Sequence, residues 1–267
     1  MAAVNSPNMN VMIRAAEKAG KSLVRDFGEV ENLQVSVKGP GDFVSAADRR
    51  SEKIIFEELK KAKPGYSFLM EESGRVDGED QTHTWIIDPL DGTTNFLHGL
   101  PHWCISIALK ENDTLTHALI YDPLKDDLFT AERGKGAYLR RRRLRVSGRR
   151  DLSMSAIATG APLSAVKKGA GEQFIKEYES VQNLGASMRR FGAAALDLAY
   201  VAAGYFDGFW ERDLKAWDVA AGILLVKEAG GFVADVDKDT NNPLQTGNIV
   251  ASNEHLFTDL KNAIRLK

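Results

Sequence analysis

The chain has 267 residues, of which 43% are hydrophobic and 27% are charged, and its 35 Lys and Arg residues nearly balance 37 Asp and Glu residues. Such a chain can bury a large core, and its net charge of −2 disfavours a protein whose main role is to coat nucleic acid or an anionic membrane. The single cysteine, Cys104, excludes an intramolecular disulfide, and the lack of CxxC and HExxH spacings disfavours a structural zinc site.

The N-terminal segment is predicted to be an amphipathic helix. Ser6 is a typical N-cap, Pro7 suits the first helical position, and apolar residues recur at helical spacing as far as Gly28. The alternation of residue types over 33–37 predicts a short strand. Glycine and proline within 38–42 predict a loop, because both residues disfavour helix and strand.

The rest of the chain is predicted to alternate between strands and helices. In chain order, we predict a helix over 46–62, strands over 67–70, 84–87, 103–109 and 115–121, a hairpin over 128–146, a strand near 154–159, and helices over 171–181, 193–203 and 217–229. The polar stretch 235–242 has the composition of a surface turn.

The most informative segment follows the apolar run that begins at Trp85 and reads Asp-Pro-Leu-Asp-Gly-Thr-Thr. Its proline and its glycine favour a tight turn that directs Asp88 and Asp91 toward one point, with the Leu90 carbonyl between them. Carboxylate and carbonyl oxygens are ligands that Mg²⁺ favours, and two acids this close repel each other unless a cation lies between them. The segment therefore predicts a magnesium site.

The residues after this turn are predicted to begin a helix. The free N–H groups of Gly92, Thr93 and Thr94 at its N-terminus would face an anion, most naturally a phosphate. The structural alternative is that Asp88 only ends a strand and Asp91 is an N-cap.

Acids occupy similar places in two other segments. Glu71 follows the apolar run 67–70, and Asp218 opens a helix that is apolar on most sides. Taken alone, Glu71 and Glu72 could be a solvated charge pair and Asp218 an N-cap. If adjacent strands bring Glu71 beside Asp88, the acids meet where loops assemble sites in layered α/β proteins.

These segments resemble the inositol monophosphatase family. The resemblance is carried by MEES at 70–73, DPLDGTTNF at 88–96, WDVAAG at 217–222 and EAGG at 228–231, and also by GDFVSAAD at 41–48, GKGA at 134–137 and RRFGAAALDL at 189–198. The last of these is most similar to the bacterial branch of the family.

The resemblance implies a mixed α/β (α+β) fold, a layered αβαβα sandwich of the kind shared with fructose-1,6-bisphosphatase. It implies one catalytic domain over 1–267, with two subdomains of roughly 1–147 and 148–267. The implied activity is Mg²⁺-dependent, Li⁺-sensitive hydrolysis of phosphate monoesters. Together with the apolar Phe191 beside Arg189 and Arg190, it also suggests a homodimer.

The family's site residues carry over position by position. The implied ligands of two or three Mg²⁺ ions are Glu71, Asp88, the Leu90 carbonyl, Asp91 and Asp218. The resemblance implies that Glu71 and Thr93 position and activate the attacking water. It also implies that Asp48 is an acid that lies behind the metal ligands. The implied substrate contacts are Glu71, Leu90, Asp91, Gly92, Thr93, Arg189, Gly192, Ala194, Glu211 and Asp218, and Lys38 lies on a loop over the site. The chain departs from the family at Met70, where glycine is common, and at Ala193, where a small hydroxyl residue is common.

The spacing of the acids favours direct attack by water over a covalent intermediate. Haloacid-dehalogenase phosphatases place nucleophile and acid at Asp-x-Asp, whereas two residues separate Asp88 from Asp91. The sequence also lacks the glycine-rich motifs that cradle nucleoside triphosphates and dinucleotides.

A basic window between Arg133 and Arg150 holds nine Lys and Arg residues and no acid. We expect a solvated hairpin, and the alternative is a contact with RNA or an acidic protein. No apolar run approaches the roughly 20 residues of a spanning helix, and residues 1–10 lack the features of a secretory signal. We therefore expect a cytoplasmic protein with no membrane contact.

The sequence thus predicts an Mg²⁺-dependent phosphatase of inositol-1-phosphate or a similar small polyol phosphate. One alternative is another small substrate, such as fructose-1,6-bisphosphate, a nucleotide phosphate or histidinol phosphate. Another is a protein that binds RNA or the transcription machinery and in which catalysis is secondary.

Overall fold

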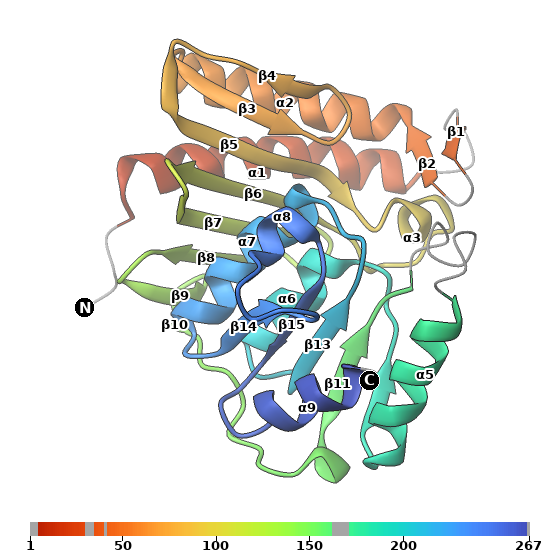
Figure 1. Cartoon of the computed structure of the whole chain (residues 1–267). Helices are drawn as coiled ribbons and strands as arrows, with labels where there is room; N and C mark the ends of the chain where they lie inside the picture. Colours follow the sequence, from red (N-terminus) through yellow and green to blue (C-terminus); the bar gives the residue numbers. More distant parts are fainter. Residues whose placement is uncertain (1–4, 30–34, 40–41, 162–170, 266–267) are drawn as a thin grey trace.

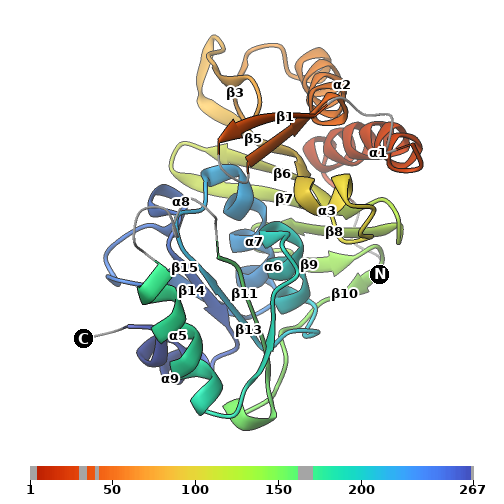
Figure 2. The ribbon, with the colours of Figure 1, turned by 90° about the vertical axis from the view of Figure 1, so that its right-hand side faces the viewer.

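The computed structural model describes residues 5–29, 35–39, 42–161 and 171–265, which stack in five layers (Figure 1). In order, the layers are helices α1 (Pro7–Phe27) and α2 (Ala46–Ala62), an eight-stranded sheet, helices α6 (Ala194–Ala202) and α7 (Ala216–Glu228), a five-stranded sheet, and helices α5 (Gly171–Asn183) and α9 (Phe257–Ile264). Figure 2 shows α5 and α9 together at the outer side of the second sheet. The predicted αβαβα sandwich is confirmed.

The first helical layer forms as the sequence predicts. The Ser6 hydroxyl accepts a hydrogen bond from the Met9 N–H, and Pro7 opens α1, which buries Met12 and Leu23 against the first sheet. α2 has the predicted bounds. The two helices pack side by side over one face of the sheet.

The first sheet has the strand order β10-β9-β8-β7-β6-β5-β3-β4. Its strands are β3 (Tyr66–Met70), β4 (Gly74–Val76), β5 (Asp80–Asp91), β6 (Cys104–Glu111), β7 (Thr114–Asp122), β8 (Asp127–Glu132), β9 (Gly136–Leu139) and β10 (Arg142–Arg143). Every pairing is antiparallel except that of β3 with β5. Because helices cover both faces, the central strands are buried on both sides.

The loop predicted over 38–42 is wrong at its ends. Lys38 and Gly39 belong to β1 (Val35–Gly39), and Asp42 begins β2 (Asp42–Ser45). The two strands pair antiparallel, with Gly39 opposite Asp42 and an irregular register after Val37. Glycine is compatible with such a bulge, so it did not end the strand. Residues 33–34 and 40–41 lie outside the described part of the chain.

The second sheet has the order β12-β11-β13-β15-β14. Its strands are β11 (Ala156–Thr159), β12 (Ser187–Arg189), β13 (Gly208–Glu211), β14 (Phe232–Asp235) and β15 (Ile249–Ser252). The strand predicted near 154–159 is confirmed from Ala156 onward, but Met154 lies in a 3₁₀ turn (Leu152–Met154) that the Asp151 side chain caps. A short helix, α8 (Pro243–Thr246), and α9 follow the predicted elements. No helix in the described ranges has the length and hydropathy of a membrane span.

The stretch 235–242 is a turn organised by a buried acid. Asp235 ends β14 and is fully buried, although we predicted a surface position for the whole stretch. Its carboxylate accepts hydrogen bonds from the N–H groups of Asp237 and Lys238 and from the Thr246 hydroxyl. These donors account for a buried carboxylate in a polar segment.

Candidate active site

The turn after β5 forms as predicted, with a strand, a tight turn and a helix start. β5 continues to Asp91, and its register with β6 is irregular between Asp88 and Asp91. The Asp88 carboxylate accepts a hydrogen bond of 2.9 Å from the Leu90 N–H, which closes the turn. Gly92 then has a φ of 92° as the N-cap of α3 (Thr93–Leu97), a conformation that favours glycine.

Side chains from two elements fix the carbonyl groups of this turn. The Ser51 hydroxyl, on α2, donates a hydrogen bond of 2.8 Å to the Pro89 carbonyl. The Thr93 hydroxyl donates one of 3.0 Å to the Leu90 carbonyl. Asp48 is buried in the first turn of α2, three residues before Ser51, so both side chains lie on the same face of the helix. The turn is therefore held in one conformation.

The parallel pairing of β3 with β5 brings Glu71 beside Asp88. Met70 is opposite Ile87, and the Glu71 N–H donates a hydrogen bond of 3.2 Å to the Ile87 carbonyl. The carboxyl groups of Glu71 and Asp88 share a hydrogen bond. The expected meeting of these two acids is confirmed.

Asp91 connects the first sheet to the helices between the sheets. Its Oδ2 accepts a hydrogen bond of 2.7 Å from the Ala195 N–H in the first turn of α6. The N-cap of α3 is Gly92, so the alternative in which Asp91 caps that helix is wrong. Asp91 instead supplies a cap to α6, whose own N-cap, Ala193, makes no side-chain cap.

Asp218 lies in the first turn of α7 and serves its helix as well as the acid cluster. The N-cap of α7 is Lys215, so the alternative in which Asp218 is the N-cap is wrong. Asp218 is the third helical residue, and its Oδ2 accepts a hydrogen bond of 2.6 Å from the Lys215 N–H. Its charge also raises the pKa of Asp88. This hydrogen bond and a place near the other acids are therefore compatible.

The acids form a concentration of negative charge. Burial, together with the charges of Glu71 and Asp91, raises the pKa of Asp88 well above its usual range. Burial, opposed by the hydrogen bond from the Ala195 N–H, raises the pKa of Asp91 to about 7. Ionised forms of such groups are favoured when a cation lies among them.

The chemistry of the donors fits Mg²⁺, since all are carboxylate or carbonyl oxygens. Among the residues that the structure describes, no three His, Cys, Asp or Glu side chains already converge as a metal site, and Glu71 and Asp88 are joined by a hydrogen bond. The fit to a cation therefore rests on the charge and on the type of donor. The assignment of the five ligands stays a prediction.

Glu211 ends β13 and lies against Gly160, which follows β11. A Cβ on Gly160 would lie 2.1 Å from Glu211 Oε2, so only glycine leaves room for this carboxylate. Burial and then the charges of Asp197 and Asp218 raise the pKa of Glu211 well above its usual range. Glu211 therefore lies in the same region of negative charge as Asp218.

The remaining predicted substrate contacts lie around the start of α6. Gly192 has a φ of 82°, and Ala194 is the first residue of the helix. Arg189 is exposed on the edge strand β12, where its guanidinium donates to Ser187 Oγ and the Met188 carbonyl. The backbone of Lys38 is in β1, and its side chain lies outside the described part of the chain.

The sequence did not single out four residues near the site, Arg190, His102, Asp197 and Asn95. The charge of Arg190 opposes the rise in the pKa of Glu211. The imidazole of His102 and the carboxylate of the buried Asp197 approach to 3.6 Å, and the charge of Asp197 raises the pKa of Asp91. Asn95 connects two loops through its amide. Each contact joins distant segments, so local sequence patterns carry no signal for it.

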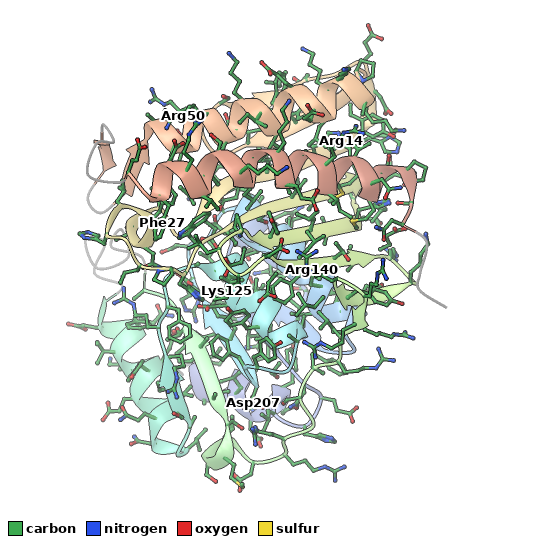
Figure 3. All side chains as sticks on the ribbon, turned by 180° about the vertical axis from the view of Figure 1, so that it is seen from behind. Arg14, Phe27, Arg50, Lys125, Arg140 and Asp207 are labelled. Atoms are coloured by element: carbon green, nitrogen blue, oxygen red, sulfur yellow. The ribbon has the colours of Figure 1, made fainter. Side chains whose placement is uncertain are left out.

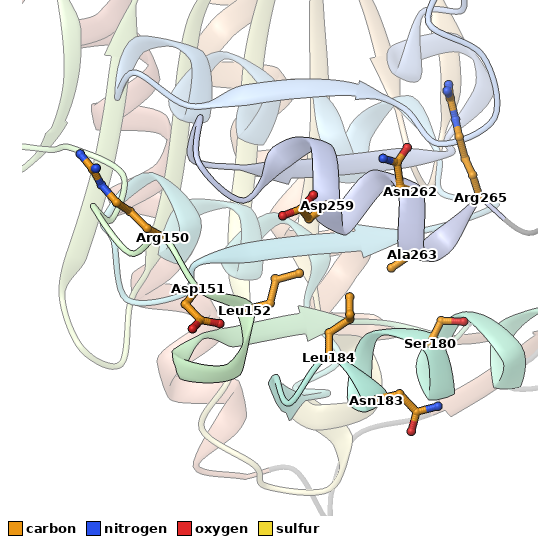
Figure 4. Close-up of a pocket in the computed structure, with 10 residues that line it drawn as sticks. All are labelled: Arg150, Asp151, Leu152, Ser180, Asn183, Leu184, Asp259, Asn262, Ala263 and Arg265. Carbon is orange, nitrogen blue, oxygen red and sulfur yellow. The ribbon is translucent and has the colours of Figure 1, made fainter.

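A large open groove lies elsewhere, on the outer side of the second sheet. It has a volume of about 880 Å³ and runs between the 3₁₀ turn, α5 and α9 (Figure 4). Its lining mixes Arg150 and Arg265 with Asp151 and Asp259. None of the predicted site residues lines it.

Comparison with known proteins agrees with the motifs. The model of the inositol monophosphatase family matches residues 5–265. An inositol-1-monophosphatase of Rhizobium meliloti is 54% identical over 257 residues, 96% of each chain. The Nus factor SuhB of Escherichia coli K12 is 46% identical and covers 92% of this chain and 91% of its own. The crystal structure of the extragenic suppressor protein suhB from Bartonella henselae has a TM-score of 0.93 at 55% identity, over 97% of this chain and 98% of its own. The chain therefore belongs to the inositol monophosphatase family.

Proposed function

We propose that the protein is an Mg²⁺-dependent phosphatase that releases inorganic phosphate from inositol-1-phosphate or a closely similar polyol phosphate. The proposed ligands of two or three Mg²⁺ ions are Glu71, Asp88, the Leu90 carbonyl, Asp91 and Asp218. The observation that carries the proposal is the group of carboxylates at the fixed turn between β5 and α3, in which Asp88 is buried and burial and mutual repulsion raise its pKa.

The residues of the turn can prepare a water molecule for attack. When bound, Mg²⁺ supplies the positive charge that offsets the phosphate dianion and makes a water more acidic. The Thr93 hydroxyl donates its proton to the Leu90 carbonyl, so it can only accept a hydrogen bond from the water. Glu71 accepts the second proton of that water and takes it up as the water attacks phosphorus.

The phosphate and the polyol are held by different elements. The first N–H groups of α3, those of Gly92 and Thr93, have no carbonyl partner within the helix and can bind phosphate oxygens. Glu211 accepts hydrogen bonds from polyol hydroxyls, and Gly192 and Ala194 allow the ring to approach the backbone. Arg189 is a further proposed contact.

A screen of phosphate release from a panel of monoesters tests this proposal. The panel holds inositol-1-phosphate, fructose-1,6-bisphosphate, a nucleoside monophosphate and histidinol phosphate, each with Mg²⁺, with EDTA, and with Mg²⁺ plus Li⁺. We expect the highest kcat/KM for inositol-1-phosphate, no turnover in EDTA and inhibition by Li⁺. A higher kcat/KM for another panel member would replace the substrate, and Mg²⁺-independent turnover would refute the mechanism.

We also propose a homodimer in the cytoplasm. Phe191 and Tyr205 are 41% and 51% exposed and belong to one aromatic cluster with His102 and Tyr200. Leu100, two residues before His102, is 53% exposed. Apolar side chains that gather in this way favour burial against a second copy. The single cysteine, Cys104, is buried as a free thiol, which suits a reducing compartment.

Light scattering measures the assembly directly. We expect a mass near twice the 29.4 kDa of the chain at micromolar concentration. Replacing Phe191 with glutamate places a charge in the patch and should shift the mass toward the monomer. A wild-type mass near that of one chain would rule out the dimer.

A second candidate function is a contact with RNA. One basic surface and the name of one relative support it. Arg140, Arg141, Arg142 and Arg143 are all exposed at the edge formed by β9 and β10. Arg140 is labelled in Figure 3. Arg142 stacks over the exposed Tyr205 ring, with 5.8 Å between the guanidinium carbon and the ring centroid. A relative that covers most of the chain is named as a Nus factor.

Replacing Arg140, Arg141, Arg142 and Arg143 with serine separates the two candidate functions. We expect kcat and the inhibition by Li⁺ to stay unchanged, because the patch lies outside the proposed catalytic segments. Binding to single-stranded RNA should weaken, and its log Kd should depend less steeply on log salt. Loss of catalysis in the folded variant would place the patch in the substrate site.

A further inference from the structure

Asn95, in α3, forms hydrogen bonds to two loops that flank the turn from Asp88 to Asp91. Its Nδ2 donates hydrogen bonds of 2.8 Å to the His102 carbonyl and 2.7 Å to the Phe191 carbonyl. The side chain is buried, with 8% of its surface exposed. We propose that Asn95 is a positioning residue that sets the place of the polyol-binding segment before α6, an inference that rests on the proposed function.

The segment from Phe191 to Ala195 is held at both ends by two side chains, Asp91 at the end of β5 and Asn95 in α3. Asp91 accepts the Ala195 N–H at 2.7 Å, and Asn95, four residues further along, binds the Phe191 carbonyl. Gly192 lies directly over the amide, since a Cβ there would be 3.5 Å from Asn95 Nδ2. The Asp91 carboxylate and the Asn95 amide thus fix the two ends of this segment.

The Phe191 ring packs against His102 and Phe206, and the Arg190 guanidinium donates to the Ala161 carbonyl, but this end of the segment stays largely exposed. The Phe191 side chain is 41% exposed, and Arg189, Arg190 and Gly192 are exposed as well. Its position therefore depends on backbone contacts more than on burial. An amide can donate two hydrogen bonds at once, and removing it leaves two carbonyls to find other donors.

The phosphate and polyol ends of the substrate should respond differently to this loss. Gly192 and Ala194, the proposed polyol contacts, belong to the segment that Asn95 holds. The N–H groups of Gly92 and Thr93 belong to the start of α3, where the Phe96 N–H still donates to the Gly92 carbonyl at 3.0 Å. Losing the amide should therefore weaken recognition of the polyol and leave phosphate binding nearly unchanged.

Kinetics of Asn95→Leu, which keeps the shape of the side chain but not its donors, test this split. We expect KM for the best polyol phosphate of the panel to rise about tenfold, since small displacements of positioning groups have large effects. KM for p-nitrophenyl phosphate, which carries no polyol, should change less than about twofold. Asn95→Ala, which leaves room for water at both carbonyls, should show a smaller rise and is used if the leucine variant does not fold.

Limited trypsin digestion gives a readout that needs no activity. Arg189 and Arg190 are exposed in the single chain, beside the Phe191 carbonyl that Asn95 binds. We therefore expect faster cleavage after these residues in both Asn95 variants, at a concentration at which light scattering gives the variants and the wild type the same mass. If the wild type hydrolyses no polyol phosphate, the proposed function fails. The digestion still tests whether the hydrogen bonds of Asn95 hold the segment before α6.

Asn253→Leu is a matched control for the loss of a buried amide. Asn253 is 2% exposed, and its Nδ2 also donates twice, to Ser147 Oγ at 2.9 Å and to the Arg149 carbonyl at 3.0 Å. We expect this variant to have a lower Tm but wild-type KM values and wild-type cleavage after Arg189 and Arg190. Equal effects of the Asn95 and Asn253 variants, or equal KM changes for both substrates, would overturn the inference.

Discussion

Replacing Asp91 with asparagine is expected to lower kcat by at least about 10³-fold and, at the same time, to stabilise the metal-free protein. Asparagine keeps an oxygen that can accept the Ala195 N–H, so α6 keeps its cap. It loses the negative charge that a metal ligand provides. Steady-state kinetics at saturating Mg²⁺ measure the first effect, and a normal kcat would remove Asp91 from the metal site.

The stability of the metal-free variant follows from the raised pKa of Asp91. Folding raises this pKa from an ordinary value of 3.8 to about 7, so the folded state disfavours the ionised form. The wild type should therefore lose stability as the pH rises from about 4 to about 7. At pH 8 in EDTA, urea unfolding should show Asp91→Asn to be more stable, by at most about 4 kcal/mol for a rise in pKa of roughly three units. At pH 4 the gain should be nearly absent, and a less stable variant at pH 8 would contradict this account.

Replacing Glu71 with glutamine should lower kcat by about 10²- to 10⁴-fold, because the amide cannot take up the proton of the attacking water. The new side-chain amide could still hydrogen-bond to Asp88, so the fold at the end of β3 should persist. KM should change only a few-fold, since the other proposed contacts, among them the N–H groups of Gly92 and Thr93 and the Glu211 carboxylate, remain. Phosphate release at saturating Mg²⁺ measures both constants.

The neighbouring acid gives the control for this variant. The Glu72 N–H donates a hydrogen bond of 2.8 Å to Glu52, and the Glu72 carboxylate lies 3.9 Å from the Arg49 guanidinium. Glu72→Gln removes a carboxylate from the same motif but should retain nearly wild-type kcat. Equal losses in the two variants would mean that the segment, and not the Glu71 carboxylate, supports catalysis.

The sequence predicts the acid cluster well because each acid directly follows or opens an apolar element. The run that ends at Met70 and the run that ends at Ile87 both read as buried strands, and each is followed by a carboxylate. Their parallel pairing places Glu71 beside Asp88. The tight turn follows from local chemistry, since only Gly92 readily takes its positive φ.

Contacts between the two halves of the site could not be predicted from the sequence. The Asp91 carboxylate binds the N–H of Ala195, and the Asn95 amide binds the carbonyl of Phe191. Both partners are backbone groups about a hundred residues away, and every residue has such groups. Because any backbone group could serve, the only structural role that the pattern suggested for Asp91, as the alternative to a metal ligand, was a local cap.

Much of the second sheet was also missed, because its strands are short and its central strands β13 and β15 are buried. Gly208–Glu211 and Ile249–Ser252 have four residues each and are almost fully covered. Apolar runs of this length do not alternate and are not distinguished from helix by periodicity. Asp235 was assigned to the surface because its neighbours are polar, whereas three kinds of donor satisfy it inside the fold.

The central claim is that the turn at Asp88 and Asp91 holds the catalytic metal. Anomalous diffraction from crystals grown with Mn²⁺, which replaces Mg²⁺ at oxygen sites, tests it most directly. The account predicts peaks at roughly 2.1 to 2.4 Å from oxygens of Asp88, Asp91 and the Leu90 carbonyl, and at least one peak bound by Glu71. Peaks only at other residues, in crystals of protein that hydrolyses phosphate monoesters with Mn²⁺, would contradict it.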